Sequence, residues 1–124
     1  MQVELVAYSI RRVLEDKIGA KVYPTYPPRD ASSFDASLGD DYHKYIVFTQ
    51  AVEVISKQSG ATLRFYLYYR NKRTIGLPEF SSCEFGIFTG RFFTSLFKHH
   101  IEDMDDAEFA DKVCEDILKT VETI

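Results

Sequence analysis

The sequence predicts a single α+β domain in which an antiparallel or mixed sheet of about four strands is packed by an N-terminal and a C-terminal helix. Apolar residues near both ends of the chain recur every three or four positions, as on one face of a helix, while those in the middle alternate with polar residues, as in strands. The length of 124 residues suits one hydrophobic core. Ten phenylalanines and eight tyrosines indicate that this core is largely aromatic. We therefore expect residues 1–124 to fold as one unit.

The first helix is expected over residues 2–18. Its apolar positions include Val3, Val6 and Ile10, and Gly19 follows where a helix can end in the left-handed conformation that glycine adopts most easily. Residues 20–23 should then be extended, because a proline such as Pro24 disfavours the helical conformation in the residue before it. A short strand is thus predicted to end at this proline.

The next segment, residues 25–42, shows no consistent period. It contains two adjacent prolines, two adjacent serines and Gly39. Irregular loops of this length are uncommon inside compact domains and are often functional or disordered. We expect a long loop that is mobile in an isolated subunit and becomes ordered against a neighbouring copy; the alternative is an insertion without a role.

A long β-hairpin is predicted over residues 45–55 and 61–69, which are rich in β-branched and aromatic residues and are joined by a turn of hairpin composition at 57–60. Alternation places Leu63, Phe65 and Leu67 on the core face. The opposite face then carries arginines and tyrosines, whose apolar bodies and polar tips suit a half-exposed face or one covered by a partner. Together with three residues of the preceding loop they form the predicted interface: Tyr26, Arg29, Phe34, Arg64, Tyr66, Tyr68 and Arg70.

Three further elements are expected after the hairpin. Residues 82–88 alternate like a strand, and residues 92–101 have helical spacing, with Thr89 as a possible cap for a short helix. The last helix is marked by Asp105 as its N-cap with Glu108 three residues later, and it should pack on the sheet beside the first helix.

Charge and cysteine content restrict the class of partner. Fifteen basic and nineteen acidic residues give a net charge of −4, which disfavours sequence-specific nucleic acid binding. A minor alternative is single-stranded nucleic acid on the basic residues Arg64, Arg70, Lys72 and Arg73, which are interleaved with tyrosines. Cys83 and Cys114 are expected to be free thiols in a reducing cytoplasm. No run of 18 apolar residues suggests a membrane span.

The sequence contains no pattern typical of an active site, and we expect no enzymatic activity, metal or cofactor. His99 and His100 would point roughly 100° apart on a helix and could not chelate one ion together, so a solvated helix end is expected there. Cys83 has no neighbouring histidine in sequence to activate it. A carboxylate group comprising Asp35, Asp40, Asp41 and Glu53 lacks the motif of a nuclease.

The order of the first elements provides the one resemblance to a family. The first helix, the run GAKVYPTYPP at 19–28 and the strand KYIVFTQ at 44–50 resemble the tail terminator and tail completion proteins of long-tailed bacteriophages. The resemblance covers residues 3–55, with a looser match at 63–69. Lys44 stands where the family usually has a proline, and the loop at 25–42 is long.

This resemblance implies a structural protein of the virion tail or neck, assembled in the host cytoplasm. In that family the subunits form a homo-oligomeric ring, usually a hexamer, which caps the tail tube and joins it to the head-side connector, and they have no catalytic residues. The alternative is a small phage or bacterial regulator that binds and inhibits a host protein, since a compact α+β domain with a tyrosine-rich face suits that role as well.

Overall fold

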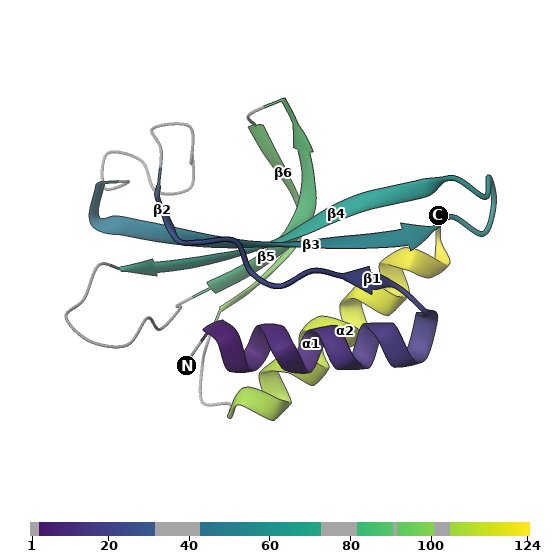
Figure 1. Cartoon of the computed structure of the whole chain (residues 1–124), viewed down its shortest axis with the longest axis horizontal. Coiled ribbons are helices and arrows are strands. Elements are labelled where there is room, and N and C mark those ends of the chain that lie inside the picture. The colour runs from purple at the N-terminus through teal and green to yellow at the C-terminus, as the bar shows by residue number, and fades with distance from the viewer. Residues whose placement is uncertain (1–2, 32–42, 73–81, 91, 101–104) are drawn as a thin grey trace.

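A computed structural model describes residues 3–31, 43–72, 82–90, 92–100 and 105–124 (Figure 1). The predicted α+β class is confirmed, with a helix near each end of the chain and an antiparallel sheet between them. The sheet has six strands instead of about four. The elements are α1 (Val3–Ile18), β1 (Lys21–Val22), β2 (Arg29–Asp30), β3 (Tyr45–Ile55), β4 (Thr62–Lys72), β5 (Ser82–Thr89), β6 (Phe92–His100) and α2 (Asp106–Glu122).

Both helices lie on the same face of the sheet, and the main core lies between these two layers (Figure 1). The fully buried side chains of this core include Ile10 and Leu14 of α1 and Ile117 of α2. In β4 the core side chains are Phe65 and Leu67, as the alternation predicts. We call the opposite side of the sheet, which bears the intervening side chains of β4, the open face. Neither helix of the described residues is long and apolar enough to cross a membrane.

The edge of the sheet beside β3 is formed by two short strands. β1 and β2 both pair antiparallel with β3, and between them the backbone amides of Tyr23 and Tyr26 donate hydrogen bonds of 3.0 and 2.8 Å to β3 carbonyls. Prolines at 24, 27 and 28 lack an amide hydrogen, which is tolerated at the edge of a sheet. The predicted loop is therefore wrong at residues 29–30, which form β2, whereas residues 25–28 beside β3 are irregular, as the sequence predicts. Residues 32–42, including Phe34, lie outside the described residues.

The β3–β4 hairpin is confirmed. Its register runs from Tyr45 opposite Lys72 to Ile55 opposite Thr62. Gly60 has a φ of +72° in the connecting turn, where the amide of Ser56 donates a 2.8 Å hydrogen bond to the carbonyl of Ala61. This conformation favours glycine and explains how so tight a turn is made.

The predicted helix at 92–101 is wrong, because residues 92–100 form β6. Gly90, with a φ of +62°, begins a turn that brings Phe92 opposite Thr89. A positive φ at the start of a tight turn matches the right-handed twist of a hairpin, and aromatic residues pack well on a pleated surface. Together, these two effects favour a strand over the helix that the spacing alone predicted.

A β-bulge bends the β5–β6 hairpin. Phe85 is opposite Phe97 and Gly86 is opposite Ser95, so Leu96 is an extra residue on β6. β4 pairs with β5 only as far as Gly86. Beyond this point the hairpin continues as a two-stranded ribbon that rises on the side away from the helices (Figure 1). The bulge therefore directs the end of the hairpin over the open face.

The N-terminus of α2 is capped as the sequence predicts. The side chain of Asp105 accepts a 2.9 Å hydrogen bond from the amide of Glu108. Along the helix, Phe109, Val113 and Ile117 are buried against the core. The acidic residues Glu108, Asp111, Glu115 and Glu122 lie on the exposed side of the helix.

Candidate interaction surface on the open face

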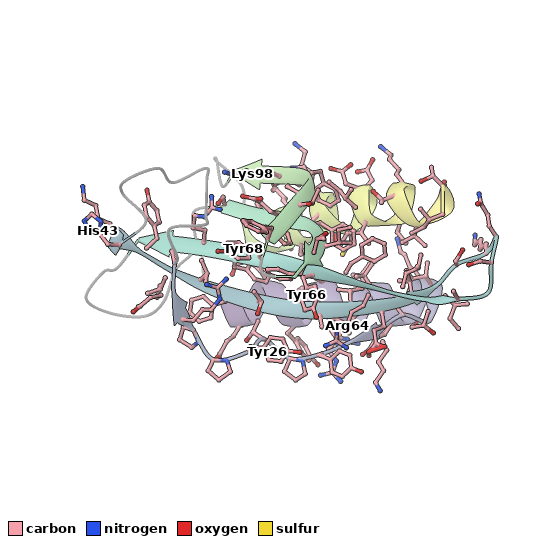
Figure 2. The ribbon with its side chains drawn as sticks, turned by 90° about the horizontal axis from the view of Figure 1, so that it is seen from above. Tyr26, His43, Arg64, Tyr66, Tyr68 and Lys98 are labelled. Atoms are coloured by element: carbon pink, nitrogen blue, oxygen red, sulfur yellow. The ribbon has the colours of Figure 1, made fainter. Side chains whose placement is uncertain are left out.

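The open face carries a hydrogen-bonded group centred on Arg64 of β4. The Arg64 guanidinium donates from Nε to the Tyr66 hydroxyl at 2.8 Å, from Nη2 to the Tyr26 hydroxyl at 3.0 Å and from Nη1 to Oε1 of Glu53 at 3.1 Å. The Tyr23 hydroxyl donates to the same Glu53 oxygen at 2.6 Å. We call these five residues the Arg64 cluster. Figure 2 looks onto the open face and shows Tyr26, Arg64 and Tyr66 on this side of the sheet.

Three local features bring the cluster together. Glu53 and Arg64 are directly opposite each other in the β3–β4 register. Tyr66 is two residues further along β4 and therefore points to the same side as Arg64. The proline-containing connection between β1 and β2 places Tyr23 and Tyr26 beside β3. Tyr23 and Tyr26 thus lie close to Arg64, which is distant in sequence, because residues 23–26 run beside β3.

Cation–π contacts add to these hydrogen bonds. The guanidinium carbon of Arg64 lies 5.2 Å from the centroid of the Tyr23 ring and 5.4 Å from that of Tyr66. The pKa of Arg64 is raised mainly by its hydrogen bond to Tyr66. The pKa of Lys21 is likewise raised mainly by the Tyr23 hydroxyl. Both cations therefore stay charged at all ordinary pH values.

The Arg64–Glu53 ion pair is half-exposed, with side-chain exposures of 41% and 21%. Such pairs contribute only about 0.2–1 kcal/mol to folding stability. The main effect of the cluster is therefore to hold three tyrosine rings in defined orientations at the surface.

Further along β4 the open face is covered by the chain itself. Tyr68 is 1% exposed, and its ring stacks on Phe93 of β6 with centroids 5.1 Å apart. The guanidinium carbons of Arg29 and Arg70 lie 5.6 and 5.4 Å from the Tyr68 centroid. With Ala31 and other neighbours, Tyr68 forms a second, smaller core.

A buried ion pair lies beside this small core. Nη2 of Arg70 is 3.2 Å from Oε1 of Glu84, and Nζ of Lys98 is 3.6 Å from the same oxygen. Arg70 and Glu84 are only 5% and 7% exposed. The expectation of a half-exposed or partner-covered stripe is therefore wrong for Tyr68, which stacks on Phe93 of the bent β5–β6 ribbon, and for Arg70, which is buried beside Glu84.

The predicted interface residues thus fall into three groups. Tyr26, Arg64 and Tyr66 share one hydrogen-bonded cluster. The second group is at the small core: Nη2 of Arg29 is 3.5 Å from the Tyr68 hydroxyl, and the guanidinium carbon of Arg70 is 5.4 Å from the centroid of the Tyr68 ring. Phe34 is outside the described residues.

The sequence-based prediction did not include Tyr23 and Glu53 in the interface. The sequence indicates only that Tyr23 is the last residue of a strand before Pro24. The place of Glu53 follows from the hairpin register, because a turn at 57–60 sets this residue opposite Arg64. Counting outward from the turn could therefore have identified Glu53 as the partner of Arg64.

The predicted solvated helix end is also wrong for His99. This residue is in β6, its Nε2 lies 2.5 Å from Oδ2 of Asp116, and its ring meets the edges of Phe97 and Phe109. The contact ties β6 to α2. The strand, which the sequence did not predict, turns this side chain toward the helix layer.

No group of three or more histidine, cysteine, aspartate or glutamate side chains that could hold a metal ion occurs in the part of the chain that the structure describes. Asp35, Asp40 and Asp41 are outside that part. Cys83 and Cys114 are free thiols, as predicted, and both are buried. Burial raises the pKa of the Cys83 thiol well above its ordinary value and that of Cys114 to about 12. Neither thiol is therefore activated as a nucleophile.

No protein-family model, curated protein or solved structure matches this chain.

Proposed function

We propose that this protein is a non-enzymatic structural subunit of the tail or neck of a long-tailed bacteriophage. Copies of it would assemble into a ring, with six subunits as in the family that the sequence resembles. The ring would cap the tail tube and join it to the head-side connector. Its place would be the virion, after assembly in the host cytoplasm.

The observation that carries the proposal is the Arg64 cluster on the open face. Tyrosine and arginine are the residue types enriched at the centres of protein interfaces. Tyr26 is 43% exposed, and its hydroxyl is already held by Arg64. Rings held in this way lose little conformational entropy when a partner covers them. The cluster therefore has the composition and the preorganisation of an interface.

The arrangement of the first elements gives further support. Of the two segments that carry the family resemblance, GAKVYPTYPP contains β1 and KYIVFTQ forms the first part of β3; β1 pairs with β3, and the amide of Tyr26 donates to the carbonyl of Thr49. The resemblance therefore concerns one contiguous edge of the sheet together with the adjacent helix α1.

Hydrodynamic measurements test this proposal. Sedimentation velocity and light scattering of the full chain, over a wide range of concentration, should reveal a species with the mass of a closed ring. A second sample should contain tail tubes expressed from the genome that encodes the chain, and electron microscopy should then show a ring at one end of each tube. A protein that stays monomeric in both samples and does not bind tube ends would refute the proposal. That result would favour the class of monomeric host-protein regulators.

A further inference from the structure

The charges of this acidic protein are divided between its two layers. α2 and its cap carry a strong excess of negative charge, with seven acidic side chains against the two lysines Lys112 and Lys119. The acidic residues are Asp105, Asp106, Glu108, Asp111, Glu115, Asp116 and Glu122. In α1, by contrast, three acidic and three basic side chains balance. The negative charge of the helix layer is therefore concentrated on α2.

The outward side of α2 forms an acidic stripe. Asp111, Glu115 and Glu122 are exposed and recur at intervals of four and seven, as does Glu108 one turn earlier. Positions at these intervals lie on one side of a helix. The buried residues Val113 and Ile117 mark the opposite side, which faces the core. We call Glu108, Asp111, Glu115 and Glu122 the acidic stripe. Its charge is still net negative when Lys119, whose Nζ is 3.3 Å from Oε1 of Glu115, is included.

The open face has the opposite sign. Among the side chains that the structure describes on this face are five cations, Lys21, Arg29, Arg64, Arg70 and Lys98, and two carboxylates, Glu53 and Glu84. Both carboxylates are already in ion pairs with cations of this face. Lys21, Arg29 and Arg64 are exposed, whereas Glu84 is buried. The charge that the open face presents to a partner is therefore positive.

We propose that subunits associate head to tail, with the open face of one copy bound to the acidic stripe of the next. This inference rests on the proposed function and specifies its assembly contact. The acidic stripe is in the helix layer, which lies on the other side of the sheet from the open face (Figure 1). Each subunit can therefore use both surfaces at once.

Symmetry and charge favour this pairing over the alternative. A contact between two open faces would bring the Arg64 of one copy near the same cationic surface of the other, and like charges across an interface oppose association. A contact between two different surfaces is heterologous, and such contacts produce closed rings when the rotation between subunits closes. Charge complementarity thus selects a contact that can generate a ring.

Charge reversals on the two surfaces test the inference. Arg64→Glu changes the open face, with Arg29→Glu as a second variant in case the first does not fold. Asp111→Lys with Glu115→Lys changes the acidic stripe. Arg12→Glu in α1 is the control, because it reverses an exposed charge that belongs to neither surface. Circular dichroism and thermal unfolding establish that each variant is folded.

We expect each surface variant to self-associate at least about tenfold more weakly than the unchanged chain. The Arg12→Glu control should associate normally. Association of the unchanged chain should weaken as salt is added, since the attraction is between exposed charges. Light scattering and sedimentation equilibrium measure these changes.

Mixing the variants gives the decisive result. Each variant retains one unchanged surface, so an equimolar mixture of an open-face variant and the stripe variant should form complexes that contain both chains. Native mass spectrometry would detect them. If the stripe variant assembles like the unchanged chain, or if the mixture stays monomeric, head-to-tail pairing is refuted while the proposed function stands. If the unchanged chain itself never assembles, with or without tail tubes, both proposals are refuted.

Discussion

Nη2 of Arg64 donates a 3.0 Å hydrogen bond to the hydroxyl of Tyr26, which lies 38 residues earlier in the chain. Arg64 belongs to the long strand β4, whereas Tyr26 belongs to the proline-containing segment at the edge of the sheet. The Arg64 side chain is 41% exposed and Tyr26 is 43% exposed, so this contact is at the surface. It therefore shapes the open face and contributes little to the core.

Two tyrosines of the open face should behave differently when truncated. Tyr68→Ala should lower the free energy of unfolding of the monomer by about 3 kcal/mol or more, because a fully buried ring leaves a cavity. Tyr26→Ala should lower it by less than about 1 kcal/mol, because the ring is half-exposed. Urea unfolding at a concentration where the chain is monomeric measures both values.

Self-association should show the reverse order for the same two variants. Tyr26→Ala should weaken it, whereas Tyr68→Ala should leave association per folded subunit unchanged. Equal losses of monomer stability in the two variants would mean that the Arg64 cluster belongs to the core.

Gly86→Ala should destabilise the protein. A Cβ atom at this position would lie 2.0 Å from the carbonyl oxygen of Thr94, so the backbone of β6 would have to move. Overpacking of this kind typically costs about 1–3 kcal/mol. Thermal unfolding measures the change, with Ser95→Ala as the control, since Ser95 is opposite Gly86 but exposed. A melting temperature as high as that of the control would show that the bulge does not need glycine.

Tyr69→Phe should destabilise the core although it removes only one oxygen atom. The Tyr69 hydroxyl donates a 2.8 Å hydrogen bond to Oε1 of Gln50, whose Nε2 donates to the carbonyl of Ala7 at 3.1 Å. Gln50 is 1% exposed, so the loss of this donor should cost about 1–3 kcal/mol.

Tyr8→Phe is the matched control for that change, because Tyr8 is 59% exposed and the same substitution there should be nearly neutral. Chemical unfolding of both variants gives the comparison. Equal stabilities would show that the Gln50 amide does not depend on Tyr69.

Stability should fall in alkali as the buried thiols ionise in the unfolded chain. Burial raises the pKa of Cys114 from 9.0 to about 12, and it raises that of Cys83 as well. A group whose pKa is raised by folding stabilises the native state below its unfolded pKa and loses this contribution as the pH rises toward its folded pKa. The loss should therefore begin near pH 9 and reach about 1.4 kcal/mol per pH unit for each thiol.

Urea unfolding between neutral pH and pH 11 tests this dependence. Cys114→Ala should reduce the slope above pH 9, because one titrating group is removed, while stability near neutral pH serves as the reference. An unchanged slope would show that Cys114 ionises equally in the folded and unfolded states.

The local elements of this fold were predictable because their signals are local. The period of apolar residues predicted α1, the Asp105 cap predicted the start of α2, and the glycine-containing turn at 57–60 predicted the β3–β4 hairpin. Alternation along β4 also predicted that Arg64 and Tyr66 lie on the side away from the core. In each case the physical cause lies within a few residues of its effect.

Tertiary structure decided the features that depend on pairing between distant segments. β2 is a strand only because β3 supplies hydrogen-bond partners to a proline-rich segment that reads as a loop. β6 is a strand because β5 pairs with it, although its apolar spacing is also compatible with a helix. The burial of Tyr68 against Phe93 follows from the bulge, which bends the β5–β6 ribbon toward it, whereas Arg70 is buried beside Glu84 of the paired strand β5. By itself the sequence determined which side chains share a face of β4; only packing against β6 decided which of them remain exposed, since burial depends on chain segments that spacing along one strand cannot reveal.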